Sequence, residues 1–142
     1  MVVTESTARV EIFQSIYTII DSNKLASTTV LATFPEKSPT FPCYVINSAD
    51  LDNEAIVLNN GKRLVNFTLE IDMYGDARDG VKKLDEMKDN VIDTLRNSTN
   101  ISSLKTDKIS IIDIVDISNA QVAFLNMKLN MGGLTISGGL LI

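Results

Sequence analysis

The stretch Leu64–Tyr74, LVNFTLEIDMY, alternates more cleanly than any other part of the 142-residue chain. Its odd positions carry the apolar side chains Val65, Phe67, Leu69, Ile71 and Met73. Its even positions carry Asn66, Thr68, Glu70, Asp72 and Tyr74. A period of two is typical of a β-strand that packs one face on the core and turns the other to water. The stretch therefore predicts the long central strand of a sheet.

Two other segments have the period of amphipathic helices. In residues 4–21 the apolar side chains stand at i, i+3, i+4 and i+7: Phe13, Ile16, Tyr17 and Ile20. The second helix is expected to begin at Asp76 as its N-cap and to run to about Asn97. Its buried stripe is predicted to consist of Val81, Leu84, Met87, Val91, Ile92 and Leu95.

Shorter apolar runs predict the remaining strands. They cover residues 28–34, 41–46, 55–58, 109–117 and 121–131, and residues 118–120 are expected to form the turn between the last two. The Asn59-Asn60-Gly61 run predicts a hairpin turn that folds residues 55–58 back on the long strand. Together these elements predict an α+β fold, with a mainly antiparallel sheet and two helices packed on one face. We expect one domain over residues 1–142, a mobile loop at 47–63 and an extended C-terminal segment at 132–142.

Composition narrows the possible functions. The formal net charge is -5 and the 13 basic residues are scattered, which disfavours tight binding to nucleic acid. The N-terminus lacks the pattern of a signal peptide, and no apolar window is long enough to cross a bilayer, so we expect a protein made in the cytoplasm without membrane contact. The single cysteine, Cys43, lies in the apolar run FPCYVI and is interpreted as a small buried hydrophobe.

The chain offers little catalytic chemistry. It has no histidine and neither nucleotide-binding glycine motif, so we expect no catalytic, cofactor-binding or metal site. The acidic loop residues Asp50, Asp52 and Glu54 suggest a calcium site, but Ala55 and Gly61 stand where that motif needs its glycine and its bidentate glutamate. Glu70 and Asp72 share a strand face. They are either a pair of catalytic carboxylates or part of a polar outward face, and the second interpretation is preferred.

The order of elements resembles the tail-terminator and head–tail joining proteins of long-tailed bacteriophages and related viruses. The residues that carry this resemblance are an N-terminal helix (VEIFQSIYTIID), the proline-flanked strand FPCYVI, a variable loop, the long strand VNFTLEIDMYGD and the helix VKKLDEMKDNVIDTL, followed by a hairpin. The resemblance implies a structural virion protein without catalytic residues. It also implies a ring, commonly a hexamer, at the head-proximal end of the tail tube, where it ends tube polymerisation and joins tail to head.

The expected partners follow from this resemblance: further copies of the chain, the tail tube protein and the head–tail connector protein. The resemblance places the protein in the tail or neck of the virion after assembly in the host cytoplasm. Genome DNA would pass through the ring without specific binding. Under this hypothesis the polar face of the long strand lines the lumen, with the candidate residues Asn66, Thr68, Glu70 and Asp72.

The last fourteen residues carry no charged side chain, and this uncharged end has two interpretations. In one it contacts another subunit or the tube, with the candidate residues Leu134, Ile136, Leu140, Leu141 and Ile142. In the other it is the last strand of the chain's own sheet. Other head–tail adaptors, stoppers or tube subunits remain alternatives, as does a small monomeric binding or adaptor module.

Overall fold

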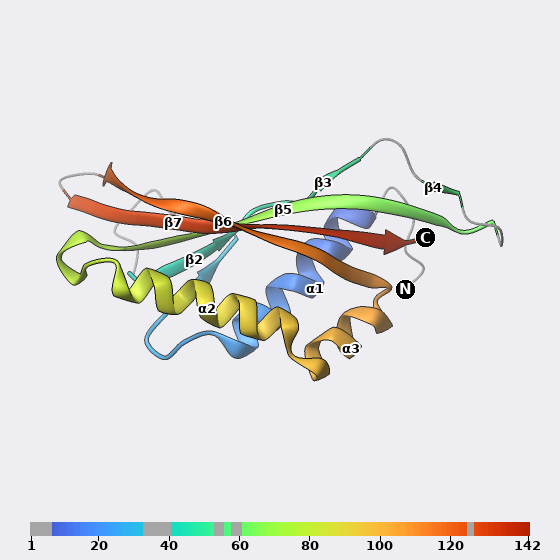
Figure 1. The fold of residues 1–142 in the computed structure, drawn as a ribbon, viewed down its shortest axis with the longest axis horizontal. Helices are drawn as coiled ribbons and strands as arrows, with labels where there is room; N and C mark the ends of the chain where they lie inside the picture. Colours follow the sequence, from blue (N-terminus) through green and yellow to red (C-terminus); the bar gives the residue numbers. More distant parts are fainter. Residues whose placement is uncertain (1–6, 33–40, 53–55, 58–60, 125–126) are drawn as a thin grey trace.

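The computed structural model describes residues 7–32, 41–52, 56–57, 61–124 and 127–142. These residues form an α+β fold with three α-helices, one 3₁₀ turn and seven strands (Figure 1). In chain order the elements are α1 Ala8–Asn23, β1 Thr29–Leu31, β2 Cys43–Ile46, β3 Asp50–Leu51, β4 Ile56–Val57, β5 Arg63–Asp76, η1 Ala77–Asp79, α2 Lys82–Arg96, α3 Ser98–Thr106, β6 Ile109–Phe124 and β7 Met127–Leu141.

The strands form one sheet in the order β1-β2-β5-β7-β6, and β3 and β4 pair with β5 beyond the end of β2. Every pair is antiparallel except β1 with β2. The predicted long strand is β5, which spans 14 residues and pairs along almost its whole length with β7. The pairing of Ile56 with Leu64 confirms that this segment folds back on β5. Asn59 and Asn60 of the predicted turn lie outside the described residues, and Gly61 has a positive φ of 79°.

The alternation of β5 decides which face of the sheet the helices cover. The odd residues from Val65 to Met73 are buried, as the sequence predicts. Phe67, Leu69, Ile71 and Met73 share one core with the buried side of each helix: Ile12, Ile16 and Ile20 of α1, Leu84, Met87, Val91 and Leu95 of α2, and Leu104 of α3. All three helices lie on the same side of the sheet (Figure 1). We call this side the helix-covered face and the other side the open face. None of the described helices is long and apolar enough to cross a membrane.

The expectation of two helices was wrong because a third helix, α3, forms from the polar segment between α2 and β6. Asn97 caps α3, and its side-chain oxygen accepts hydrogen bonds from the backbone N–H groups of Thr99 and Asn100. Leu104 is its one buried side chain, since most of the helix is exposed. A short polar helix with a single buried position gives too weak a periodic signal to be recognised.

The expected start of the second helix was also wrong. Asp76 caps the 3₁₀ turn η1 rather than α2, and it accepts from the backbone N–H of Arg78 at 3.0 Å. Gly80, with a φ of 70°, separates this turn from α2. The helix begins at Lys82, so Val81 lies just outside it and is exposed rather than part of the buried stripe.

The predicted turn at residues 118–120 is not a turn. Strand β6 continues through these residues to Phe124, and an irregularity in pairing between Ile117 and Ala120 absorbs them. A second irregularity lies between Ile111 and Asp113. It shifts the alternation, so that Ile111 and Ile114 pack against the core while Val115 is exposed. Extra residues in a strand reverse the faces that follow, which a strict period of two cannot anticipate.

The uncharged C-terminal end is a strand of the chain's own sheet. Strand β7 lies between β5 and β6, so its backbone is paired on both sides. Its doubled glycines are not turns; they leave room for side chains of neighbouring elements. Lys88 approaches Gly132 from α2, and the ring of Phe67 lies over Gly138. Glycines at these positions of a central strand leave space for bulky side chains of neighbouring elements to pack over the strand.

Candidate interaction surface

Strand β6 forms one free edge of the sheet. Among the described residues it pairs only with β7, and it spans 16 residues. Two of its large apolar side chains are exposed, Ile112 by 68% and Val115 by 50%. A long edge strand presents unpaired backbone N–H and C=O groups, which can pair with a strand of another chain. This edge is therefore a candidate contact surface.

The two irregularities limit where a partner strand can pair. Between them Asp113–Ile117 keeps continuous register with Ser137–Gly133 of β7. Bulges interrupt the regular spacing of edge groups and are one way in which proteins restrict unwanted pairing. The regular stretch of β6 is thus short, and it lies beside a pocket.

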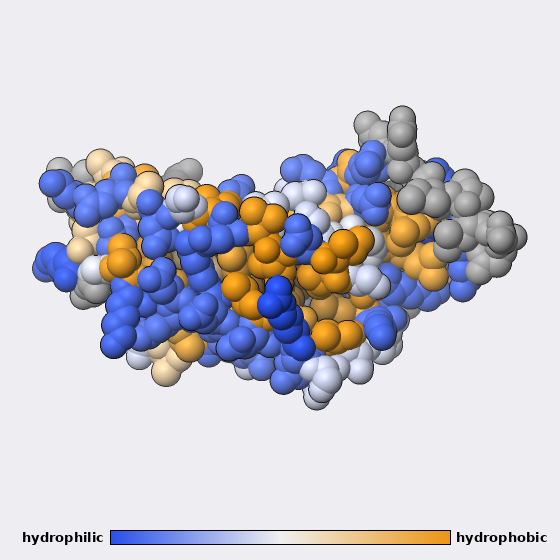
Figure 2. Space-filling model, viewed as in Figure 1, coloured by the Kyte–Doolittle hydropathy of each residue, from blue (hydrophilic) through white to orange (hydrophobic). Residues whose placement is uncertain are grey.

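The pocket has a volume of about 220 Å³ and lies between β6, the end of α2 and α3. Its apolar lining comes from Leu95 of α2, from Ile101 and Leu104 of α3, and from Ile109, Ile111, Ile112 and Ile114 of β6. Figure 2 shows apolar side chains gathered over this region, interrupted by strongly hydrophilic ones. We call this feature the β6 groove.

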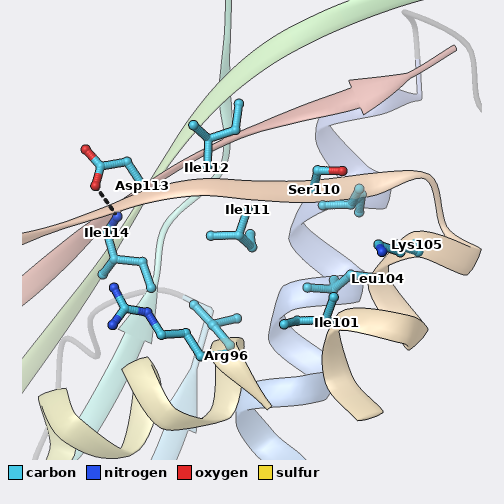
Figure 3. Close-up of a pocket in the computed structure, with 11 residues that line it drawn as sticks. Arg96, Ile101, Leu104, Lys105, Ser110, Ile111, Ile112, Asp113 and Ile114 are labelled. Atoms are coloured by element: carbon cyan, nitrogen blue, oxygen red, sulfur yellow. Dashed lines mark hydrogen bonds between the residues drawn. The ribbon is translucent and has the colours of Figure 1, made fainter. Parts of the chain in front are cut away.

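Side chains of β6 point to both sides of the strand, and the groove lies on only one of these sides (Figure 3). Ile111 and Ile114 point toward the helices, whereas Ile112 points away from them. The carboxylate of Asp113 turns back to β6 and accepts a hydrogen bond from the backbone N–H of Ile114 at 2.9 Å. The irregularity at Ile112 thus opens the groove on one side of the strand and exposes an apolar side chain on the other.

Two cations stand at the rim of the groove. Arg96 ends α2 and Lys105 lies in the last turn of α3, and in Figure 3 they mark opposite ends of the groove. Both side chains are exposed, and neither forms an ion pair or a side-chain hydrogen bond with the described residues. An apolar floor between two unpaired cations suits a ligand that combines apolar and acidic groups.

Lysine 88 holds the far half of β6 to α2. Its ammonium donates to the backbone oxygen of Ile117 at 2.8 Å and pairs with Asp116 at 2.7 Å. Lys88 is only 7% exposed, whereas the side chain of Asp116 is 66% exposed. Asn119 adds a hydrogen bond to Asp85 of α2 at 3.3 Å. These contacts anchor the irregularity between Ile117 and Ala120, so this part of the edge is already engaged by the chain itself.

The candidate lumen residues all lie on the open face of β5. Thr68 and Glu70 are exposed, while Asn66 and Asp72 are half-buried. Asn47 bridges two of these positions, because its side-chain amide donates to the backbone oxygen of Glu70 and to Oδ2 of Asp72, each at 3.0 Å. The structure therefore brings the four side chains together on one face.

Glu70 and Asp72 influence each other directly. Partial desolvation raises the pKa of Glu70, and the negative charge of Asp72 and a hydrogen bond with it raise that pKa further. Oδ1 of Asp72 is buried against Gly133 and has no hydrogen-bond partner among the described residues. A protonated Glu70 can donate a hydrogen bond to Asp72, and this favours the protonated form of Glu70.

The candidate contact residues of the C-terminal end lie mostly in the core. Leu134, Ile136 and Leu140 are at most 1% exposed, and only Leu141 and Ile142 are partly accessible. Leu141 and Ile142 are also tied by backbone hydrogen bonds, to Lys108 and Arg63. In this structure Leu134, Ile136 and Leu140 stabilise the fold, as the alternative interpretation of the C-terminus proposes.

The other sequence candidates do not gather into a reactive centre. The described residues contain no group of three His, Cys, Asp or Glu side chains placed to hold a metal ion. Asp50 and Asp52 are exposed, and Glu54 lies outside the described residues. Cys43 is buried, and burial raises the pKa of its thiol to about 12. Such a thiol is protonated and unreactive at neutral pH, in agreement with its interpretation as a buried hydrophobe.

The β6 groove was not predicted from the sequence. It depends on α3 and on the irregularity at Ile112, both of which were missed. One signal was present: Asn97 is a good N-cap residue, and Ile101, Leu104 and Lys105 follow at helical spacing. No protein-family model and no curated protein matches the chain.

Proposed function

We propose that this protein is a structural assembly component that forms a ring at the head-proximal end of a phage-like tail tube, where it ends tube growth and joins the tail to the head. The observation that carries the proposal is the β6 edge, a 16-residue sheet margin with exposed apolar side chains beside an apolar groove. Margins of this kind serve assembly, because strand pairing and apolar burial together join two chains.

The arrangement of the other elements supports the same role. A mostly antiparallel sheet with helices on one face leaves the open face available as a second surface. The polar residues of β5 on that face suit a wet lumen, and an acidic protein does not hold DNA tightly. Protonation of Glu70 would reduce the negative charge of this face at acid pH.

A second function is favoured by the groove itself. A pocket of about 220 Å³ at a free sheet edge is also suited to a small monomeric adaptor that captures one segment of a partner. Adaptor, stopper and tube-subunit roles within a head–tail assembly use the same kinds of surface. The state of assembly distinguishes the first proposal from the monomeric one.

Electron microscopy of tail tubes with and without the purified protein tests the proposal. We expect a collar at one end of each tube and no further growth at that end after the protein is added. Multi-angle light scattering of the protein bound to, and released from, the tubes gives the number of copies. Tubes that keep growing and carry no collar would contradict the proposal, and a protein that binds as one copy would favour the adaptor.

The lumen hypothesis needs its own variants. Thr68→Lys and Glu70→Lys place positive charge at exposed positions of the open face, where folding tolerates it. If this face lines the channel, the variant ring assembles normally but retains DNA and slows its release. Glu86→Lys, on the exposed face of α2, is the control. Unchanged release from rings that contain both substitutions would exclude β5 from the lumen.

A further inference from the structure

The β6 groove has the chemistry to select one kind of partner. We propose that it receives an extended segment of a different protein, which pairs with the regular stretch of β6, places a large apolar side chain in the groove and sets acidic residues against Arg96 and Lys105. This inference deepens the proposed function, since it describes the chain that the protein joins, but peptide binding can be measured whether or not a ring forms.

The size of the groove sets the apolar requirement. A volume of about 220 Å³ exceeds the roughly 150 Å³ cavity that is known to hold a benzene molecule. One large aliphatic or aromatic side chain therefore fits. Ile101, which lines the groove from α3, is 37% exposed, so an occupant would remove apolar surface from water.

The rim sets the charge requirement. Arg96 and Lys105 are unpaired within the described residues, although the protein as a whole has a net charge of -5. The lining also contains the exposed carboxylate of Asp113, which accepts from the backbone N–H of Ile114. The acidic residues of a partner must therefore lie beside Arg96 and Lys105 and not opposite Asp113. A partner with carboxylates beside its apolar side chain would neutralise the two cations, while a basic partner would be repelled.

The backbone sets the shape requirement. Asp113–Ile117 is in continuous register with β7 on one side and has no strand on the other among the described residues. Two backbone groups of this stretch already have partners, because the N–H of Ile114 donates to Asp113 and the oxygen of Ile117 accepts from Lys88. An extended segment can pair with the remaining edge groups, and its alternate side chains point toward the helix-covered face, where the groove lies. Strand pairing and side-chain insertion are thus compatible in one pose.

The chain's own opposite edge is a poor occupant. Asp50 of β3 pairs with Thr68, Thr68 with Ser137, and Ser137 with Asp113. The two aspartates therefore stand in one row at opposite edges of the sheet. A second copy added edge to edge without a shift along the strands would set Asp50 against Asp113, and like charges opposite each other destabilise a pair of strands. The β6 edge would then join the ring to a different protein, and the subunits of the ring would contact each other through other surfaces.

Fluorescence anisotropy with labelled synthetic peptides of about ten residues tests this inference. The first peptide carries one leucine with a glutamate two positions before it and another two positions after it, so that all three side chains share one face, and it has serine elsewhere. The second peptide replaces both glutamates with lysine, and the third replaces the leucine with serine. We expect saturable binding of the first peptide to the full chain and at least about tenfold weaker binding of the other two. N-methylation of alternate backbone nitrogens should abolish binding in one register and spare it in the other, because only one set of N–H groups faces β6.

Protein variants locate the site. Arg96→Glu with Lys105→Glu should weaken binding of the acidic peptide at least about tenfold and improve binding of the basic one. Lys82→Glu with Lys83→Glu, on the exposed start of α2, is the matched control and should leave both affinities unchanged.

Three results would overturn the inference: no binding of the acidic peptide, equal binding of the basic peptide, or equal loss in the control variant. Sedimentation equilibrium of the same variants tests whether a second copy of this chain occupies the groove. If Arg96→Glu with Lys105→Glu dissociates an oligomer of this chain while no peptide binds, the groove holds a second copy and the inference of a foreign partner is wrong. Ring formation on tubes is measured separately, so failure of peptide binding leaves the proposed function intact.

Discussion

The ring of Phe67 lies over Gly138, its cross-strand neighbour on β7. A Cβ atom at Gly138 would come within 2.7 Å of this ring and would also collide with the backbone oxygen of Ser110. The long alternating strand and the glycine-rich C-terminus are therefore complementary, because the large side chains of one need the missing side chains of the other. This relationship explains why an apolar strand with four glycines can occupy the centre of the sheet.

Replacement of Gly138 by alanine should destabilise the protein. The added methyl group overpacks the core, which typically costs about 1–3 kcal/mol. Urea unfolding, followed by circular dichroism, measures the change. Gly75→Ala is the control, because the nearest atom to its Cβ would be Leu84 Cδ2 at 3.8 Å, an ordinary contact. Equal stability of the two variants would contradict the packing described for Phe67.

Replacement of Lys88 by methionine should also cost stability. Methionine keeps the apolar stem but removes the hydrogen bond to Ile117 and the ion pair with Asp116. The loss of a partner for a partly buried carbonyl typically costs about 1–3 kcal/mol. Hydrogen exchange should also accelerate in the second half of β6. Lys82→Met, whose ion pair is exposed and 4.0 Å long, should change stability by less than about 0.5 kcal/mol.

Glu70 gives stability a defined pH dependence. Its pKa is raised in the folded protein, so the folded state holds the proton more tightly than the unfolded state. The contribution of Glu70 is therefore fully present below its unfolded pKa and is lost as pH rises through its folded pKa. Glu70→Gln removes the ionisation and should be more stable than the wild type at about pH 7, with a smaller difference at about pH 4.

The control for this experiment is Glu86→Gln, at an exposed carboxylate on α2. It should follow the wild-type dependence on pH. Thermal unfolding at several pH values measures all three proteins. If Glu70→Gln is no more stable than the wild type at neutral pH, the interaction between Glu70 and Asp72 is absent.

Substitutions of two leucines distinguish whether the C-terminal segment is part of the core or contacts another subunit. Leu140 is 0% exposed, and Leu140→Ala should cost about 2–5 kcal/mol of unfolding free energy. Leu141 is half-buried on the open face, so Leu141→Ala should lower the unfolding free energy by less. Denaturant unfolding compares them. A stable, monomeric Leu140→Ala variant of an otherwise oligomeric protein would instead restore the C-terminus as a subunit contact.

How far the sequence predicts this structure depends on how regular each element is. Strand β5 and most of the buried stripe of α2 were predicted because their periods are uninterrupted: Leu84, Met87, Val91 and Leu95 are all buried. Strand β6 was cut short at Ser118 because polar residues within a strand resemble a turn. The irregularities that accommodate them depend on Lys88 and Asn119, which contact β6 only in the folded chain.

The candidate site was harder to predict than the fold. The four polar residues of β5 share a face as expected, since that follows from alternation alone. The groove forms only where α2, α3 and β6 pack together, and no local sequence pattern predicts this tertiary packing. The apolar C-terminus looked like a contact surface because its pairing partners, Phe67 and Leu69 among them, lie far away in the chain.

A cryo-electron microscopy map of the protein on the end of a tail tube tests the central claim, that the chain works by assembly through its sheet margin. We predict a closed ring of identical subunits in which protein density pairs with Asp113–Ile117 and fills the β6 groove. A solitary subunit with β6 open to solvent, or one that holds a small molecule in the groove, would contradict the account.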